Sequence, residues 1–252
     1  MIATFHDLAG ASVFITGGGN GIGAALTDGF LAQGAKVAFV GRKDATAFVD
    51  EMAAKHGNRP LFIRCDITDT AALQAAIATA ADQHGPLRAL VNNAANDVRH
   101  DAREVTPQQW DDLQAVNLKA YFFASQKAAE VMGPQGAIIN FSSISYMMGA
   151  AGMITYTTAN AGITGMTRSL AREWGPRGIR VNAIAPGWVF TEKQETMWAT
   201  PEGKAAFLEK QCLRQFMTPD DMVGPVLFLA SQASAMMTGQ TMVVDAGVVG
   251  TG

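Results

Sequence analysis

Cysteine is nearly absent from this sequence, which has only Cys65 and Cys212 among its 252 residues. The two lie far apart and belong to no Cys-x-x-Cys pair, so the sequence indicates neither a disulfide framework nor a zinc site. We therefore expect free thiols, a reducing compartment and no bound metal ion.

Charged residues and long apolar runs are also scarce. Only 16% of the residues are charged, the formal net charge is -3, and Lys and Arg form no dense patch. A nucleic-acid surface requires clustered positive charge, so we expect a small-molecule substrate and no nucleic-acid partner. No apolar run reaches the length of about 18 residues that spans a membrane, and the first residues lack the pattern of a signal peptide. We expect a cytoplasmic protein without a membrane partner.

The sequence does contain a large apolar fraction, 48%, with no flexible linker, so one domain over residues 1–252 is expected. Seven short apolar runs alternate with amphipathic stretches such as Ala71–Ala81, which predicts a parallel sheet with helices on both faces. The predicted strands are Ser12–Thr16, Lys36–Val40, Leu61–Arg64, Ala89–Val91, Ala137–Phe141, Arg180–Ile184 and Thr241–Val244. The fold class is α/β, a single Rossmann-type, doubly wound domain.

Two helix starts carry a readable pattern. Thr106-Pro107-Gln108-Gln109 and Thr218-Pro219-Asp220-Asp221 each offer a hydroxyl cap followed by a proline. A polar side chain three residues after the cap completes the pattern of a helix N-terminus.

Glycines are concentrated directly after the first predicted strand, in Thr16-Gly17-Gly18-Gly19-Asn20-Gly21-Ile22-Gly23. Such a turn can bring backbone amides and a helix N-terminus to a pyrophosphate, although it can also serve only as a tight turn. Its place between a strand and a helix favours dinucleotide binding.

The end of the second predicted strand carries Gly41, Arg42 and Lys43 and no acidic residue. An NAD enzyme usually has a carboxylate here for the adenine ribose, whereas cations suit the 2′-phosphate of NADP. We expect NADP or NAD, with NADP preferred. The alternative is that Arg42 and Lys43 are solvated loop charges.

Further motifs follow in a fixed order along nearly the whole chain. They are Asn92-Asn93-Ala94-Ala95, Asn117, Ser143 with Tyr156 thirteen residues later, and Pro186-Gly187 with Thr191 beyond. Together with the glycine turn, this order resembles the short-chain dehydrogenase/reductase family, with Ala95 in place of the usual glycine. The resemblance implies a cofactor site formed by Gly17, Gly19, Asn20, Gly21, Ile22, Gly23, Arg42, Asp66, Ile67, Asn93, Ala94, Tyr156, Asn160, Pro186, Gly187, Val189 and Thr191.

The resemblance also implies the catalytic roles: Tyr156 as the acid/base, Ser143 as the group that holds the substrate oxygen, and Asn117 as support for a proton relay. The family has a lysine four residues after the tyrosine, and this sequence has Asn160. A cation about 4 Å from a phenolate contributes on the order of 4 kcal/mol at an effective dielectric near 20. We therefore expect impaired turnover. Lys119 is the nearest cation in a motif, and the family pattern gives it no place beside the tyrosine.

The individual motifs also have simpler interpretations. Ser143 could be one of several serines in a polar turn, and Tyr156 could be a core residue. Their joint spacing favours an active site, or the remnant of one.

Two stretches, Val91–His100 and Thr191–Leu213, are similar to family members that oxidise aldoses at C1. A polyol needs several donors and acceptors, and the expected substrate residues are Asn96, Ser143, Ser145, Tyr156, Trp188 and Gln194. Alternatively, Asp97, Arg99 and His100 form a solvated loop, and Met147, Met148 and Met153 line an apolar pocket of an oxoacyl or steroid-like ketone reductase. A third alternative is a dinucleotide-binding protein without turnover.

The resemblance further implies a homotetramer. The apolar segment Met222–Ala230 and the predicted strand Thr241–Val244 are the parts that the family buries against a second subunit. Two-fold association is also the commonest route to closed assemblies.

Overall fold

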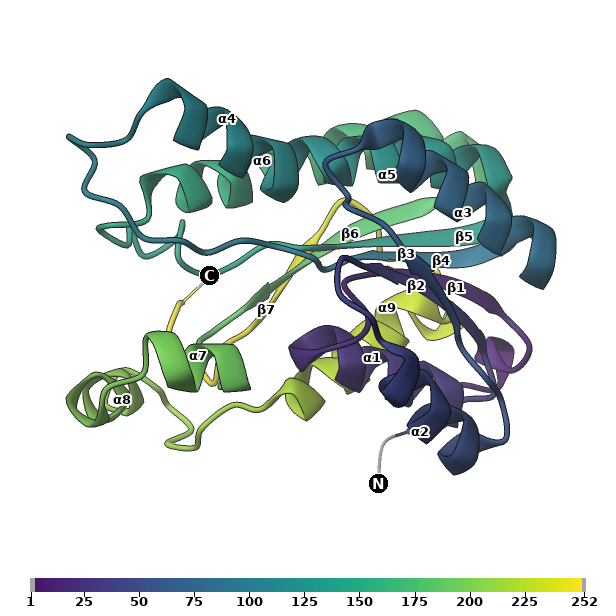
Figure 1. The fold of residues 1–252 in the computed structure, drawn as a ribbon, viewed down its shortest axis with the longest axis horizontal. Coiled ribbons are helices and arrows are strands. Elements are labelled where there is room, and N and C mark those ends of the chain that lie inside the picture. Colours follow the sequence, from purple (N-terminus) through teal and green to yellow (C-terminus); the bar gives the residue numbers. More distant parts are fainter. Residues whose placement is uncertain (1–2, 251–252) are drawn as a thin grey trace.

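Seven parallel strands form one sheet in the order β3-β2-β1-β4-β5-β6-β7 (Figure 1). The computed structural model describes residues 3–250. The strands are β1 (Ser12–Thr16), β2 (Lys36–Gly41), β3 (Leu61–Arg64), β4 (Leu87–Asn92), β5 (Met132–Phe141), β6 (Arg180–Pro186) and β7 (Thr241–Val244). The chain builds outward from β1 in one direction and then from β4 in the other, so the winding reverses between β1 and β4.

All seven predicted strands are confirmed, three of them with their predicted bounds. The central strands are buried along their length, as in β1 and β6, because helices cover both faces of the sheet. The other four are longer than predicted, since ladder pairing continues beyond the apolar runs on which the prediction was based. Pro186, for example, still pairs with Val244.

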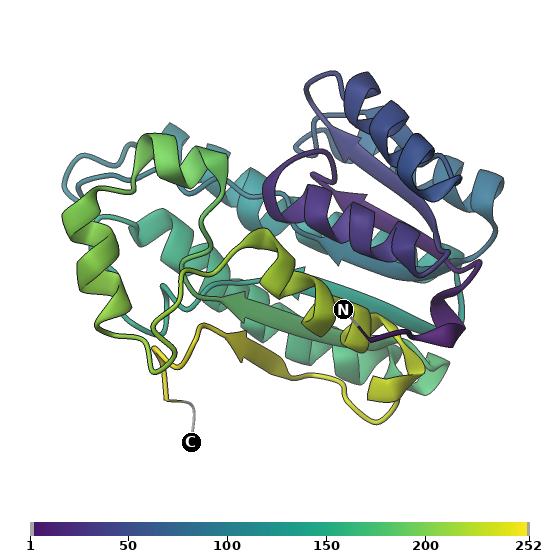
Figure 2. The same ribbon diagram turned by 90° about the horizontal axis from the view of Figure 1, so that it is seen from below.

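The helices form two layers, one on each face of the sheet (Figure 1 and Figure 2). One layer holds α1 (Gly21–Ala32), α2 (Thr46–His56) and α9 (Val223–Ala230), and the other holds α3 (Thr70–His84), α4 (Pro107–Gln114), α5 (Ala120–Val131) and α6 (Ile154–Trp174). Two short helices, α7 (Glu192–Met197) and α8 (Pro201–Leu208), stand apart from both layers. A π-helical turn over Ala115–Lys119 joins α4 to α5.

Both predicted helix starts are confirmed. The Thr106 hydroxyl accepts from the backbone amide of Gln109 at 3.2 Å, and the side-chain oxygen of Gln109 accepts from the backbone amide of Thr106 at 2.9 Å. Thr218 and Asp221 form a second capping box, which begins a 3-10 helix over Pro219–Met222 that leads into α9.

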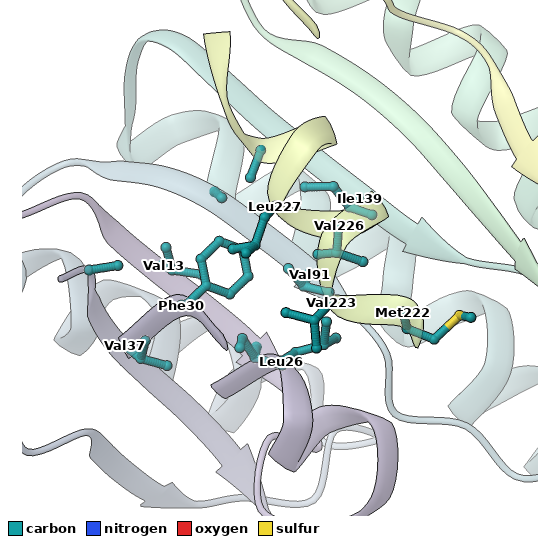
Figure 3. Packing of buried hydrophobic residues seen from close by; sticks show 14 of the residues in the cluster. Val13, Leu26, Phe30, Val37, Val91, Ile139, Met222, Val223, Val226 and Leu227 are labelled. Carbon is teal, nitrogen blue, oxygen red and sulfur yellow. The ribbon is translucent and has the colours of Figure 1, made fainter. Parts of the chain in front are cut away.

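The hydrophobic core under α1 and α9 explains the apolar C-terminal segment. Figure 3 shows Phe30 and Leu26 of α1 facing Val226 and Leu227 of α9 over the strands. Both α9 side chains are fully buried within this one chain. The apolarity of Met222–Ala230 is thus largely accounted for by the protomer's own core, and the subunit contact expected for this segment stays a prediction. Strand β7, at the sheet edge, is only partly buried.

Other sequence expectations concern cysteines, metals and membranes. Cys65 and Cys212 are free thiols. Among residues 3–250, no group of three or more His, Cys, Asp or Glu side chains could hold a metal ion. Within the same residues, no helix combines the length and apolarity needed to cross a membrane.

Candidate active site

A cleft of about 1890 Å³ lies at the carboxyl ends of the strands. Its walls come from the segments that follow β1, β2, β3, β4, β5 and β6, and from α7 and α8. This is the place where open parallel sheets bind ligands, since the reversal between β1 and β4 leaves a crevice there.

The glycine turn after β1 forms one end of the cleft. Gly17 and Gly21 have φ angles of +71° and +50°, which favour glycine. A Cβ atom on Gly23 would lie 1.9 Å from the Gly17 carbonyl oxygen, so helix α1 can approach the turn this closely only without a side chain. Asn20, at the N-cap of α1, makes no side-chain capping bond. The first amides of α1 are therefore available to an anion.

Thr16 ties this turn to the end of β4. Its hydroxyl oxygen accepts hydrogen bonds from the Asn93 amide at 2.9 Å and the Ala94 amide at 3.1 Å. The Asn93 side chain donates in return to the Thr16 carbonyl at 3.0 Å. These bonds fix the two strand ends on either side of the winding reversal.

Arg42 and Asp66, which follow β2 and β3, also line the cleft. The Arg64 side chain donates to the Arg42 carbonyl at 3.0 Å, which holds the backbone there while the Arg42 side chain is exposed. The Asp66 carboxylate accepts from the amide and hydroxyl of Thr68. The Thr68 amide lowers the pKa of Asp66 despite partial desolvation, and the positive charge of Arg42 contributes to the lowering.

Ser143 and Tyr156 come together in the middle of the cleft, one beyond β5 and the other in the first turn of α6. Burial raises the pKa of the Tyr156 phenol above its ordinary value, and the negative charge of Asp97 raises it further. Hydrogen bonding with Ser143 and Asn160 acts in the opposite direction without offsetting these effects. The phenol thus favours its protonated form.

Asn160 is buried one helical turn after Tyr156, with 2% of its surface exposed. Its side-chain nitrogen donates to the backbone carbonyl of Tyr156 at 2.8 Å. Its backbone carbonyl accepts from the hydroxyls of Ser142 and Thr164. One N–H of the side chain is therefore used within α6.

Asn117 lies in the π-helical turn and is also buried. Its side-chain oxygen accepts from the Asn96 amide at 2.7 Å, and its side-chain nitrogen donates to the Asn96 carbonyl at 2.8 Å. Both bonds fix the backbone of Asn96 at the cleft wall. Single π-helical turns of this kind are frequent at functional sites.

Ser145, Trp188 and Gln194, which are expected to bind substrate, line the cleft as well. The Ser145 hydroxyl is buried and has no hydrogen-bond partner among the described residues. The Trp188 indole nitrogen donates to the Gln194 side-chain oxygen at 2.9 Å, and the Trp188 ring meets the Phe207 ring edge-on. These residues thus offer hydroxyl and amide groups beside aromatic faces.

The structure brings nearly all of the predicted site residues to one cleft. Of the described residues predicted for the site, Asn117 and Asn160 are not part of its lining, and the others are. Sequence reasoning missed Asp97 and Lys193, which also line the cleft and pair with each other. They are distant in sequence, so no local pattern could have indicated their contact.

Comparison with known proteins agrees with this fold. Residues 17–249 match the family model described as enoyl-(acyl carrier protein) reductase. A probable galactose dehydrogenase of Rhizobium meliloti is 46% identical over 248 residues, which cover 97% of each protein. The D-xylose 1-dehydrogenase of Caulobacter vibrioides is 44% identical over 249 residues, covering 97% of this chain and 98% of that protein.

A solved structure gives the same result. The short-chain dehydrogenase of Burkholderia cenocepacia in complex with NADP is 32% identical, covers 96% of this chain and 98% of that chain, and superposes with a TM-score of 0.89. The chain belongs to the short-chain dehydrogenase/reductase family. Its class is therefore that of the oxidoreductases.

Proposed function

We propose that this chain is an NADP-preferring dehydrogenase that oxidises an aldose at C1, with turnover limited by Asn160. The observation that carries the proposal is one cleft that joins the glycine turn to the Ser143–Tyr156 pair and then to unpartnered polar groups. The two relatives at 46% and 44% identity, named for galactose and D-xylose, support the choice of a sugar.

The residues at the first end of the cleft fit a dinucleotide. The glycine turn is a cradle that a single Cβ on Gly23 would fill, and the open amides of α1 suit a pyrophosphate. Arg42 would hold the 2′-phosphate, with Asp66 and Ile67 beside the adenine. Asn93, Ala94, Pro186, Gly187, Val189 and Thr191 line the continuation of the cleft toward the nicotinamide end. When bound, the nicotinamide ring supplies the acceptor for a hydride.

Tyr156 would manage the proton. In oxidation, the sugar C1 loses a hydride while its hydroxyl proton passes to the Tyr156 phenolate, and C1 becomes a lactone carbonyl. Ser143 holds the reacting oxygen through its hydroxyl and stabilises the phenolate by hydrogen bonding. Asn117, through its two bonds to Asn96, keeps the cleft wall in place.

Ser145 and Gln194 would bind the remaining sugar hydroxyls. The buried Ser145 hydroxyl has its donor and acceptor free among the described residues, and a substrate hydroxyl would satisfy both. The Trp188 ring offers an apolar face to the C–H side of a sugar ring. Polar groups fixed in this way reject substrates that lack the matching hydroxyls.

The test is direct. Affinity for NADP and NAD is measured by titration, and turnover is then assayed with a panel of aldoses and, in the reverse direction, ketones. We expect cofactor binding, with NADP tighter, and slow lactone formation from a pentose or hexose. Tyr156→Phe should abolish that turnover and leave cofactor affinity within about twofold, because the phenol oxygen acts in the chemical step. Turnover of ketones alone would contradict the sugar proposal.

A ketone reductase is the second candidate, and one observation favours it. Met148, Met153 and Met197 line the outer part of the cleft, and Met148 and Met197 are exposed there. Flexible thioether side chains accommodate apolar substrates. The reverse arm of the same panel tests this candidate.

A further inference from the structure

The segment that carries α7 and α8 is attached to the molecule mainly at its base. Val189 and Met217 form an isolated parallel bridge there, both 5% exposed, and the Phe190 amide donates to the Met217 carbonyl at 2.8 Å. Beyond this base, no described residue of α7 or α8 is buried. Hydrophobic burial therefore holds the base and leaves α7 dependent on polar and aromatic contacts.

Asp97 supplies those contacts from the opposite wall of the cleft. One carboxylate oxygen accepts from the Lys193 ammonium at 2.5 Å, and the other accepts from the Gln194 amide nitrogen at 2.5 Å. The carboxylate side chain is 16% exposed, against 47% for Lys193. The charged residue that the sequence left open as part of a solvated loop is thus enclosed and engaged on both oxygens.

The Asp97 contact continues through Gln194 to the base of the segment. The Gln194 oxygen accepts from the Trp188 indole N–H, so the amide can present only its nitrogen to Asp97. A second contact crosses the cleft beside it, where the Arg99 guanidinium lies 4.6 Å from the centre of the Trp198 ring. The loop after β4 therefore holds α7 at two points.

We propose that Asp97 is the positioning residue that holds α7 over the substrate end of the cleft by accepting hydrogen bonds from Lys193 and Gln194 together. A carboxylate suits this position, because Lys193 and Gln194 each present N–H groups to a different oxygen, whereas an amide has one acceptor oxygen and would turn its NH2 group toward the other neighbour. Bonds from Lys193 and Gln194 keep the pKa of Asp97 below its ordinary value even though burial acts to raise it. Asp97 is therefore charged at neutral pH and held in place.

We call the two hydrogen bonds from Lys193 and Gln194 to Asp97 the clasp. Its expected effect on sugar binding rests on the proposed function. Gln194 is one of the expected hydroxyl ligands, and its amide orientation is set by Asp97 on one side and Trp188 on the other. Loss of the clasp should raise KM for the sugar. Asp97→Asn also removes the negative charge that helps to raise the pKa of Tyr156, so kcat for oxidation should rise rather than fall.

The experiment is hydrogen exchange of the full-length protein, followed over the α7 amides, with steady-state kinetics alongside. Asp97→Asn should speed the hydrogen exchange of the α7 amides by about fivefold or more, because the clasp stabilises the closed state of that segment against local opening. In the double change Asp97→Asn with Gln194→Glu, the new amide at position 97 can donate to the new carboxylate at position 194. One hydrogen bond between the two positions is thus restored, and α7 exchange should return to within about twofold of wild type. The matched control is Glu195→Gln, which removes the exposed pair between Glu195 and Lys204 inside the same segment and should leave α7 exchange nearly unchanged.

Three results would overturn the clasp: unchanged α7 exchange in Asp97→Asn, no recovery in the double variant, or an equal rise in β4 and β5, which would indicate general loosening. The exchange result does not depend on turnover. If α7 responds as expected while no aldose is oxidised, the sugar proposal fails and the clasp stands. If aldoses are oxidised and Asp97→Asn alters neither exchange nor KM, the clasp fails and the sugar proposal stands.

Discussion

The side-chain nitrogen of Asn160 donates a hydrogen bond to the backbone carbonyl of Tyr156, and no charge accompanies it. The charge that acts on the phenol comes instead from Asp97, which is negative and raises the pKa of Tyr156 together with burial. The structure therefore adds to the consequence expected from the sequence. Tyr156 is held in its protonated form more firmly than the loss of a lysine alone would require.

The first prediction concerns this pKa. Oxidation needs the phenolate, so its rate should climb with pH and level off only above about pH 10, the ordinary value for tyrosine. Asn160→Lys adds a cation, lowers the pKa of Tyr156 and should move this limb to lower pH while raising kcat by at least about tenfold. Profiles of kcat against pH at saturating cofactor measure both effects.

Asn160→Met is the control for that change, because it has nearly the length of lysine without the charge. It should not move the pH limb to lower pH, and loss of the Asn160 hydrogen bond should move the limb slightly higher. If Asn160→Lys binds cofactor but turns over no faster on any substrate, the missing lysine does not limit this site, and Tyr156 loses its assignment as acid/base.

The second prediction concerns cofactor choice. Arg42→Ala should weaken NADP binding by about tenfold and NAD binding much less, since a charge-assisted bond to the 2′-phosphate is lost. Titration of both cofactors measures the ratio. Arg59→Ala removes an exposed cation that pairs with Asp50, and should change neither affinity. Equal losses for NADP and NAD in Arg42→Ala would refute the role of Arg42.

The third prediction concerns the core between α1 and α9. Leu227 is fully buried there, so Leu227→Ala should lower the free energy of unfolding by about 2–5 kcal/mol through lost burial and a residual cavity. Leu213, which is 65% exposed, provides the control, because Leu213→Ala should change stability by less than about 0.5 kcal/mol. Denaturant unfolding compares the two, and similar losses would show that the packing in Figure 3 is not what stabilises this region.

The fourth prediction is a homotetramer. Strand β7 stands at an edge of the sheet and is partly buried, and an edge of this kind is open to a partner. Light scattering at micromolar concentration should give four times the chain mass of 26.6 kDa. A monomeric mass would contradict it, and a dimeric mass would show that only one of the two-fold contacts of a tetramer forms.

The sequence by itself determined the strands, the two capped helix starts and the glycine turn, because each depends on neighbours within a few residues. Ser12–Thr16 is apolar and β-branched and so forms a buried strand, and Thr106 caps a helix whose third residue can return the bond. Nearly all of the residues that the ordered motifs indicated line the cleft, since carboxyl ends of parallel strands meet at one edge.

Only the tertiary structure decided the contacts between distant segments. The apolar side chains of α9 are buried in the protomer's own core. Asn117, in the π-helical turn, forms hydrogen bonds with the backbone of Asn96. Above all, the tertiary structure brought Asp97 to Lys193 and Gln194 across the cleft. Burial and turns leave a pattern in neighbouring residues. Contacts between polar groups of distant segments depend instead on which loops the strand order of the whole sheet places next to each other.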